Sequence, residues 1–315
     1  MQDKRFMKNK TILRIILVLY AAMMIASLFA CDKAGSDEDQ ALVLEPVGTF
    51  SNTNIDESSG IIQSSHDTSL YWTHNDSGGD AVLYSVKADG TSGSTAAITI
   101  SDATNIDWED ITMDGDGNIY VGDIGNNNPP YFERDNLCLY KISEPDLESS
   151  TVSGAVAIPF VYPDYSFATR YNYDAEAIFW SDGTVYLLTK HYLDTMSILY
   201  RFDDLSGSET TTLTRIDSFD AQGSVSAADA SADGNRLVVL ANVYVGYPST
   251  AITSSIIWLF EVTSGDNYFN GTKYRLRIDA GQCEAICFMD DNTLLITNEE
   301  KQLFTVNVDQ LIEIK

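Results

Sequence analysis

The 315-residue chain has few basic residues, and this scarcity excludes one class of partner. Nineteen lysines and arginines stand against 46 aspartates and glutamates, which gives a net charge of −27. Positions 1–30 hold five of these basic residues and one acid, so the remainder carries 14 against 45, or −31. Phosphate backbones repel such a chain, and we expect no nucleic-acid partner.

Long hydrophobic runs are also missing. The longest apolar stretch, residues 15–29, has 15 residues, fewer than the roughly 20 that a membrane-spanning helix needs. With 44% apolar and 21% charged residues, the chain has the composition of a globular protein. No Gly-x-Ser-x-Gly, His-Glu-x-x-His or phosphate-cradling lysine motif is present, which argues against serine-hydrolase and zinc-protease chemistry.

Residues 1–30 have the pattern of a secretion signal. Basic residues between Lys4 and Arg14 precede the apolar stretch, which ends at Ala30-Cys31. A small residue before a cysteine here resembles a lipobox, where a signal peptide is cleaved and the cysteine is acylated. We predict a lipoprotein anchored to the membrane through Cys31. The alternative is an ordinary signal peptide with an incidental cysteine.

Residues 31–40 are acidic and show no apolar periodicity, which predicts a solvated tether between the lipidated cysteine and the folded domain. An acidic run directly after a lipidated cysteine is similar to the surface-export signal of some Gram-negative lipoproteins. This resemblance implies an outer membrane lipoprotein, at the cell surface or in the periplasm.

Three further cysteines fit this location without defining it. Cys283 and Cys287 lie four residues apart on a predicted strand, roughly 13 Å at the rise of a strand, too far to bridge. We predict buried free thiols, although a bridge from Cys138 to one of the two stays open. No spacing matches a zinc site.

From residue 41 the sequence repeats a unit of short β-type runs separated by turns. Each unit opens with a Ser or Glu two positions before a small or branched aliphatic residue, continues through a hairpin turn, and then has an apolar strand. The openings are Ser59, Glu109, Glu176, Ser226 and Glu284, which are 50, 67, 50 and 58 positions apart. Such a period, with four strands in a unit, is typical of a β-propeller.

We therefore predict an all-β fold in which residues 41–315 form one five-bladed β-propeller. The fifth unit has room for only three strands before the chain ends, so residues 42–50 are expected to supply the missing outer strand and close the ring. A six-bladed propeller is the alternative, because residues 143–175 are long for a single connection.

The five openings converge at the mouth of the central tunnel in such a fold. Period-two spacing is expected to place each opening residue at the mouth and the aliphatic residue deeper on the same side. Three carboxylates in a narrow tunnel repel one another, and Ca²⁺, which takes six to eight oxygen ligands in flexible geometry, would relieve this repulsion. We predict a calcium site formed by Ser59, Glu109, Glu176, Ser226 and Glu284. Partial protonation or bonding to waters and backbone N–H groups is the alternative.

The loops after the second strand of each unit surround the same mouth and are rich in polar residues. We predict a ligand site there. Its candidate residues are Asn75, Asp76, Asp123, Asn126, Lys190, His191, Asn298 and Glu299. Cations such as Lys190 at an acidic tunnel could meet an anionic ligand or could pair with a carboxylate of the ring.

Several segments together resemble a family of uncharacterised bacterial propeller lipoproteins. They are Asn75-Asp-Ser-Gly-Gly79, Asp107-Trp-Glu-Asp-Ile111, Tyr120-Val-Gly-Asp-Ile-Gly-Asn-Asn127 and Asp174-Ala-Glu-Ala-Ile178. More remotely, the Ser-Glu-Glu-Ser-Glu ring is similar to that of the calcium-activated apyrases, which are five-bladed nucleotidases. That resemblance implies that the five ring residues bind calcium. The mouth loops do not match the apyrase motifs.

Two functions follow from this reading. The first is a lipid-tethered, monomeric binding module in which Ca²⁺ stiffens the tunnel and the mouth loops capture a small molecule, glycan or protein. The alternative is a calcium-dependent phosphohydrolase of nucleotidase or phytase type, in which the ion polarises a phosphoryl oxygen.

Overall fold

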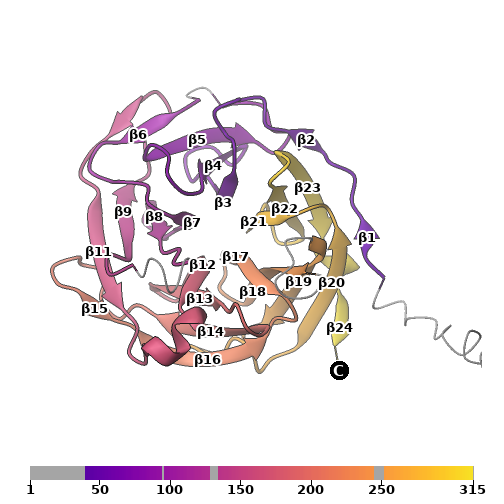
Figure 1. The fold of residues 1–315 in the computed structure, drawn as a ribbon. Coiled ribbons are helices and arrows are strands. Elements are labelled where there is room, and N and C mark those ends of the chain that lie inside the picture. The colour runs from indigo at the N-terminus through magenta and orange to yellow at the C-terminus, as the bar shows by residue number, and fades with distance from the viewer. Residues whose placement is uncertain (1–39, 94–95, 128–133, 245–251, 315) are drawn as a thin grey trace, which may run out of the picture. The chain divides into compact units, whose positions relative to one another are not determined.

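Five sheets, each with four antiparallel strands as its main part, surround a central axis in the computed structural model, which describes residues 40–93, 96–127, 134–244 and 252–314 (Figure 1). The innermost strands β3, β7, β12, β17 and β21 lie around the tunnel, and each contacts the innermost strand of the next blade. The predicted five-bladed β-propeller is therefore confirmed.

Each blade follows the chain outward from the tunnel. Blade 1 contains β3 (Ser58–Gln63), β4 (Leu70–Asn75), β5 (Val82–Lys87) and β6 (Ile98–Ile100). Blade 2 contains β7 (Trp108–Met113), β8 (Asn118–Asp123), β9 (Cys138–Ser143) and β11 (Val156–Val161). Blade 3 contains β12 (Asp174–Ser181), β13 (Thr184–Lys190), β14 (Met196–Arg201) and β16 (Thr214–Asp220).

The last two blades have the same order. Blade 4 contains β17 (Ser224–Ala230), β18 (Arg236–Tyr244), β19 (Ile252–Glu261) and β20 (Lys273–Asp279). Blade 5 contains β21 (Cys283–Phe288), β22 (Thr293–Asn298), β23 (Gln302–Asn307) and, as its outer strand, β2 (Gly48–Thr49). Because β2 precedes blade 1 in the sequence, it closes the ring as predicted.

The segment expected to form one closing strand is divided between two blades. β2 pairs antiparallel with β23, whereas β1 (Leu42–Val43) pairs parallel with β20 of blade 4, which also pairs with β24 (Ile312–Ile314). Residues 44–47 connect the two short strands, so the segment binds the outer edges of two neighbouring blades.

The long connection at 143–175 does not add a sixth blade. Its strand β11 is the outer strand of blade 2, and β10 (Thr151–Val152) pairs parallel with β6 at the edge of blade 1. In the same way, β15 (Thr211–Thr212) pairs parallel with β11. Two short 3₁₀ helices, η2 (Phe167–Asn172) and η3 (Val308–Gln310), complete the regular elements of the described residues. None of the helices in the described parts of the chain is long and apolar enough to cross a membrane.

The hydrophobic core lies between the blades. Each pair of adjacent blades shares one cluster of buried side chains, such as Tyr120 and Phe160 of blade 2 against Tyr200 of blade 3. The aliphatic residues expected deeper in the tunnel belong to these clusters instead. They are Ile61, Ile111, Ile178, Ala228 and Ile286. The cysteines Cys138, Cys283 and Cys287 are buried free thiols, as predicted.

A β-bulge recurs at the same place in all five innermost strands and explains this difference. The pairing of each innermost strand with the next strand skips one residue near its start. The skipped residues are Ser59, Glu109, Glu176, Ser226 and Glu284. A bulge breaks the two-residue alternation of side chains. The residue two positions later therefore need not share the side of the strand on which the opening residue lies.

Side chains at the axis connect the blades. The Ser59 hydroxyl donates to the carbonyl of Glu109 at 2.7 Å, and the Ser226 hydroxyl donates to the carbonyl of Cys283 at 2.9 Å. Asp110, only 1% exposed, accepts bonds through Oδ2 from the N–H groups of Ile178 at 2.9 Å and Ala228 at 3.3 Å. One carboxylate of blade 2 thus bonds to the innermost strands of blades 3 and 4.

Replacing Asp110 with Ala is expected to lower the free energy of unfolding by at least about 3 kcal/mol, because buried N–H groups of three innermost strands lose their acceptor. Asp110→Asn, which keeps one acceptor oxygen, should cost less. Urea unfolding followed by circular dichroism measures both changes. The exposed Asp309→Ala variant is the control, and an Asp110→Ala protein as stable as this control would contradict the role.

Candidate metal centre

The five bulge residues meet different partners at the tunnel mouth. The two serines are engaged with backbone carbonyls, whereas Glu109 and Glu176 lie close together with Asp174. Glu284, on the other side of the ring, accepts a hydrogen bond from Gln282 at 2.6 Å. Of the predicted calcium ligands, the structure therefore brings together Glu109 and Glu176, while Ser59 and Ser226 connect blades.

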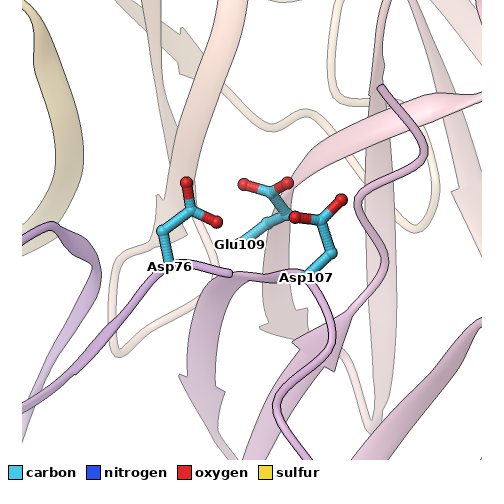
Figure 2. Close-up of side chains that lie close together, drawn as sticks. All are labelled: Asp76, Asp107 and Glu109. Carbon is cyan, nitrogen blue, oxygen red and sulfur yellow. The ribbon is translucent and has the colours of Figure 1, made fainter. Parts of the chain in front are cut away.

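Two groups of three carboxylates share Glu109. One oxygen from each of Asp76, Asp107 and Glu109 lies within 4.8 Å of the others (Figure 2). The same holds for Glu109, Asp174 and Glu176. We call these five residues the mouth cluster. Asp76 comes from the loop after β4, Asp107 precedes β7, and Asp174 begins β12, so blades 1, 2 and 3 all contribute.

Gly125 makes room for the centre of this cluster. A β-carbon at this position would lie closer to Glu109 Oε1 and Asp107 Oδ2 than real β-carbons ever approach another atom. The glycine of the Asp123-Ile-Gly-Asn126 segment therefore lets two carboxylates pack directly against the backbone of the loop after β8. This close approach explains why the motif has a glycine at position 125.

A second set of residues holds the cluster in place. Asp123, fully buried, accepts a bond from the N–H of Asp107 at 3.0 Å and pairs with Arg134 at 2.7 Å. Arg134 also donates to the carbonyl of Gly125 at 2.8 Å. The N–H of Asn126 donates to Asp174 Oδ1 at 2.7 Å. Asp123 and Asn126, predicted to bind a ligand, thus fix the backbone of Asp107 and the carboxylate of Asp174.

Lys190 lies among these carboxylates rather than in front of them. Its ammonium pairs with Glu176, and the Lys190 side chain is 19% exposed. Burial opposes the charge of Lys190, but Glu176 and Asp174 outweigh this effect and raise its pKa well above the usual value. The pairing with a ring carboxylate is one of the two alternatives that the sequence left open. The next residue, His191, pairs with Asp194 at 2.7 Å.

Burial and mutual repulsion raise the pKa values of the cluster. Burial raises the pKa of Asp76 to about 7, with the Asp107 charge adding to it. Burial and Glu176 raise the pKa of Asp174 to about 7, and burial raises that of Asp107 to about 6 although Arg134 opposes the shift. Burial and Glu176 also raise the pKa of Glu109 well above its usual range. These groups therefore bind protons more tightly than free carboxyl groups do when no further cation is present.

Glu284 shows the same effect at the far side of the ring. Burial is the main cause of its pKa of about 8, and the charge of Glu176 adds to it, while Lys190 opposes it. The negative potential therefore extends across the mouth beyond the two groups of three.

Three carboxylate oxygens of this region are buried and have no hydrogen-bond partner among the residues that the structure describes. They are Asp76 Oδ1, Asp123 Oδ2 and Asp174 Oδ2. A buried charged oxygen without a partner is costly. Calcium ligands lie about 2.4 Å from the ion, so oxygens within 4.8 Å of one another can share one ion. The donor set consists of hard carboxylate oxygens and therefore fits Ca²⁺.

The other residues that were predicted to bind a ligand form hydrogen bonds with neighbouring segments at the mouth. The Asn75 amide accepts a bond from the N–H of Asp56 at 3.0 Å and donates to the carbonyl of Asn54 at 2.8 Å. Asn298 donates to the carbonyl of Ala280 at 2.8 Å. Glu299 accepts a bond from Gln282, which also bonds to Glu284.

Asp107 and Asp174 are the cluster residues to which the sequence gave no role, although both stand in the motifs of the resemblance. Each lies two positions before a ring glutamate, Glu109 or Glu176. This shared spacing is a signal that could have identified them. The corresponding residue before Glu284 is Gln282, whose amide bonds to that glutamate.

Comparisons with known proteins find only distant similarity, and only to solved structures. No family model and no curated protein matches the sequence. Among solved structures, hydrazine synthase of Kuenenia stuttgartiensis is 13% identical with a TM-score of 0.45 over 80% of this chain, which spans 65% of the length of that one. A luciferin-regenerating enzyme is 14% identical with a TM-score of 0.43, over 82% of this chain and 80% of its own. The Cps50 (Swd1) β-propeller domain from Myceliophteria thermophila is 9% identical with a TM-score of 0.38, over 80% and 97%.

In chelator, the melting temperature is expected to fall as the pH rises from about 5 to about 8. Carboxyl groups with pKa values raised to about 6, 7 and 8 in the folded protein bind protons more tightly than the unfolded chain, whose values are about 4. Their stabilising contribution is complete below about pH 4 and is lost as the pH rises through the folded values. Differential scanning calorimetry measures the slope.

The Glu109→Gln variant should show a shallower fall, because it removes one charge from the centre of the cluster. The same substitution at the exposed Glu313 should leave the slope unchanged. A melting temperature that rises over this range, or equal slopes for Glu109→Gln and wild type, would contradict the electrostatic description.

Proposed function

We propose that this chain is a lipid-anchored binding module of the cell envelope whose tunnel mouth holds one Ca²⁺ ion in the mouth cluster. The propeller fold is consistent with a recognition platform. The observation that carries the proposal is Glu109, which is 4% exposed and belongs to both groups of three converging carboxylates.

The balance of charge supports a bound cation. Five carboxylates form the cluster and Asp123 adjoins it, and within the described parts of the chain Lys190 and Arg134 are the cations paired with members of this set. Two positive charges against six negative ones leave four uncompensated. A dication would halve this excess and could take up the partnerless oxygens of Asp76 and Asp174.

Calcium is favoured over magnesium by the construction of the site. The carboxylates come from the loop after β4, from the segment before β7, from the start of β12 and from bulges of two blades. Ca²⁺ accepts six to eight oxygens in flexible geometry, whereas Mg²⁺ requires nearly ideal octahedral placement and retains its waters.

The ion would fix the loop carrying Asp76 to blades 2 and 3 and so shape the mouth for a ligand. The Asn75 and Asn298 amides donate to the carbonyls of Asn54 and Ala280 in neighbouring loops, and the Asn126 amide accepts a bond from the N–H of Arg134. We therefore infer that the ligand meets the ion and the charged groups around it rather than these amides. Its class, whether small molecule, glycan or protein, follows from binding screens on the calcium-loaded domain.

Calcium is expected to bind the folded domain with a stoichiometry of one and to raise its stability. At a free concentration 100 times the Kd, the gain is about 2.7 kcal/mol. Isothermal titration of residues 41–315, first treated with chelator at pH 7.5, measures the stoichiometry, and calorimetric melting measures the gain.

The Glu109→Gln variant should bind calcium at least about 100-fold more weakly, because Glu109 belongs to both groups, and Glu313→Gln should bind like wild type. If wild type shows neither binding heat nor a melting shift with millimolar Ca²⁺, the calcium site does not exist. If Glu109→Gln binds normally, the ion lies elsewhere.

The lipid anchor rests on the residues around Cys31, which lie outside the described part of the chain, as does most of the tether at 31–40. Cys31→Ser in the full chain is expected to abolish incorporation of labelled palmitate and to move the protein from the membrane to the soluble fraction. Fractionation and labelling in a Gram-negative host measure both. Continued membrane retention with normal labelling would show that Cys31 is not the anchor.

The calcium-dependent phosphohydrolase stays a prediction with weaker support. Lys190, the cation that could face a phosphoryl group, pairs with Glu176 in this structure. Phosphate release from nucleoside diphosphates or phytate, abolished by chelator and by Glu176→Gln, would replace the binding module with this enzyme.

A further inference from the structure

A cavity lies at the end of the tunnel opposite the mouth cluster. Its volume is about 610 Å³, within the range of small-molecule sites. The innermost strands all run in one direction, from the bulges at their starts to this cavity at their ends. The wall is formed by the ends of β3, β7, β12, β17 and β21, by the hairpin turns that follow, and by residues 262–265.

The wall of this cavity carries charge of one sign. Six of its residues are aspartates, and the described residues that form it include no lysine, arginine or histidine. The six are Asp114, Asp182, Asp229, Asp233, Asp290 and Asp291. A concave surface with one sign of charge concentrates ligands of the opposite sign.

These carboxylates differ in how many hydrogen bonds they accept from residues of their own hairpins. Asp114 accepts bonds from Asn118 and Tyr120, and Asp233 from Ser231 and Asn235, so both are satisfied locally. Asp229 is different, because it comes from the innermost strand β17 and is 7% exposed.

Asp229 lies at the base of the cavity between two blades. Its Oδ2 accepts a bond from the N–H of Phe288 in blade 5 at 2.9 Å. Burial raises its pKa to about 7. A cation beside it would favour its charged form.

Apolar groups share the wall with these acids. Trp180 is half-buried, and its ring stacks on Tyr120 with centroids 5.7 Å apart and planes 18° apart. Phe288, Met113 and Met289 also line the cavity. Aromatic faces beside carboxylates are a surface to which organic cations bind.

The protein already uses one of these rings in this way. The guanidinium of Arg236 lies 5.4 Å from the centroid of the Phe288 ring and donates to the carbonyl of Asp291 at 2.6 Å. This internal cation contacts the rim of the cavity at blade 5. The opposite part of the wall, with Trp180 and Asp182, belongs to blade 3 and faces the cavity from another direction.

We propose that this cavity binds a small organic ammonium compound, with its charged nitrogen beside Asp229 and Asp182 and its apolar part against Trp180. The combination of size, uniform negative charge and aromatic surface carries the assignment. The site is independent of the calcium site, because its residues come from the opposite ends of the innermost strands.

Three probes that share a 2-phenylethyl group and differ in charge test the proposal. They are 2-phenylethylamine, 2-phenylethanol and 3-phenylpropionate, titrated into residues 41–315 at pH 7.5 in saturating Ca²⁺ and followed by saturation-transfer NMR. The amine is expected to bind at least about tenfold more tightly than the alcohol, a difference of about 1.4 kcal/mol, and the carboxylate is expected not to bind.

Three variants locate the site. Asp229→Asn keeps an acceptor for the N–H of Phe288, and Asp182→Asn suits the positive φ of 47° at that position. Each should weaken amine binding about tenfold or more, and Trp180→Leu should weaken both the amine and the alcohol. Glu313→Gln and Asp309→Asn on the surface are the controls and should bind the amine like wild type.

Equal binding of amine and alcohol would overturn the proposal, as would the absence of amine binding at millimolar concentrations. Amine binding that Glu109→Gln abolishes, while Asp182→Asn and Asp229→Asn leave it unchanged, would place the amine at the mouth and would also overturn it. The calcium titration is measured separately, so failure here leaves the mouth cluster untouched.

Discussion

Repulsion among buried carboxylates at one end of the tunnel is the constraint on which the site depends. Glu109 lies between two pairs of acids contributed by three blades. Charges of one sign at such distances raise one another's pKa values unless a cation is present. Lys190 and Arg134 supply part of this compensation. The cluster therefore keeps protons, as its raised pKa values describe, or it takes up a further cation.

The propeller can withstand the repulsion among these carboxylates because hydrogen bonds connect its blades at the axis and apolar side chains pack between their faces. Asp110 binds backbone groups of blades 3 and 4, and Ser59 and Ser226 each bind the next blade. Five apolar clusters fix the faces of the blades. The strand β2 closes the ring by pairing with β23. The charged groups are thus attached to a frame whose stability comes from elsewhere.

The sequence predicted the fold and the positions of the ring because both follow from a repeat. The spacing of the units predicted Glu109 and Glu176 as calcium ligands. The polar loop after the second strand of the first unit predicted Asp76 as a ligand-binding residue. The roles of Ser59 and Ser226 could not be predicted, because the direction of a side chain at a bulge depends on how the neighbouring strand pairs. The role of Asp110 could not be predicted either, because the N–H groups that it binds lie 68 and 118 residues away in the sequence.

A crystal structure of residues 41–315 grown at neutral pH with Ca²⁺, with anomalous data collected, examines the mouth cluster directly. We expect one calcium peak in contact with Glu109 and with acids of both groups, with the Lys190 ammonium still paired with Glu176. Ordered water at the mouth without an anomalous peak would contradict it, and protonation alone would then account for the buried carboxylates.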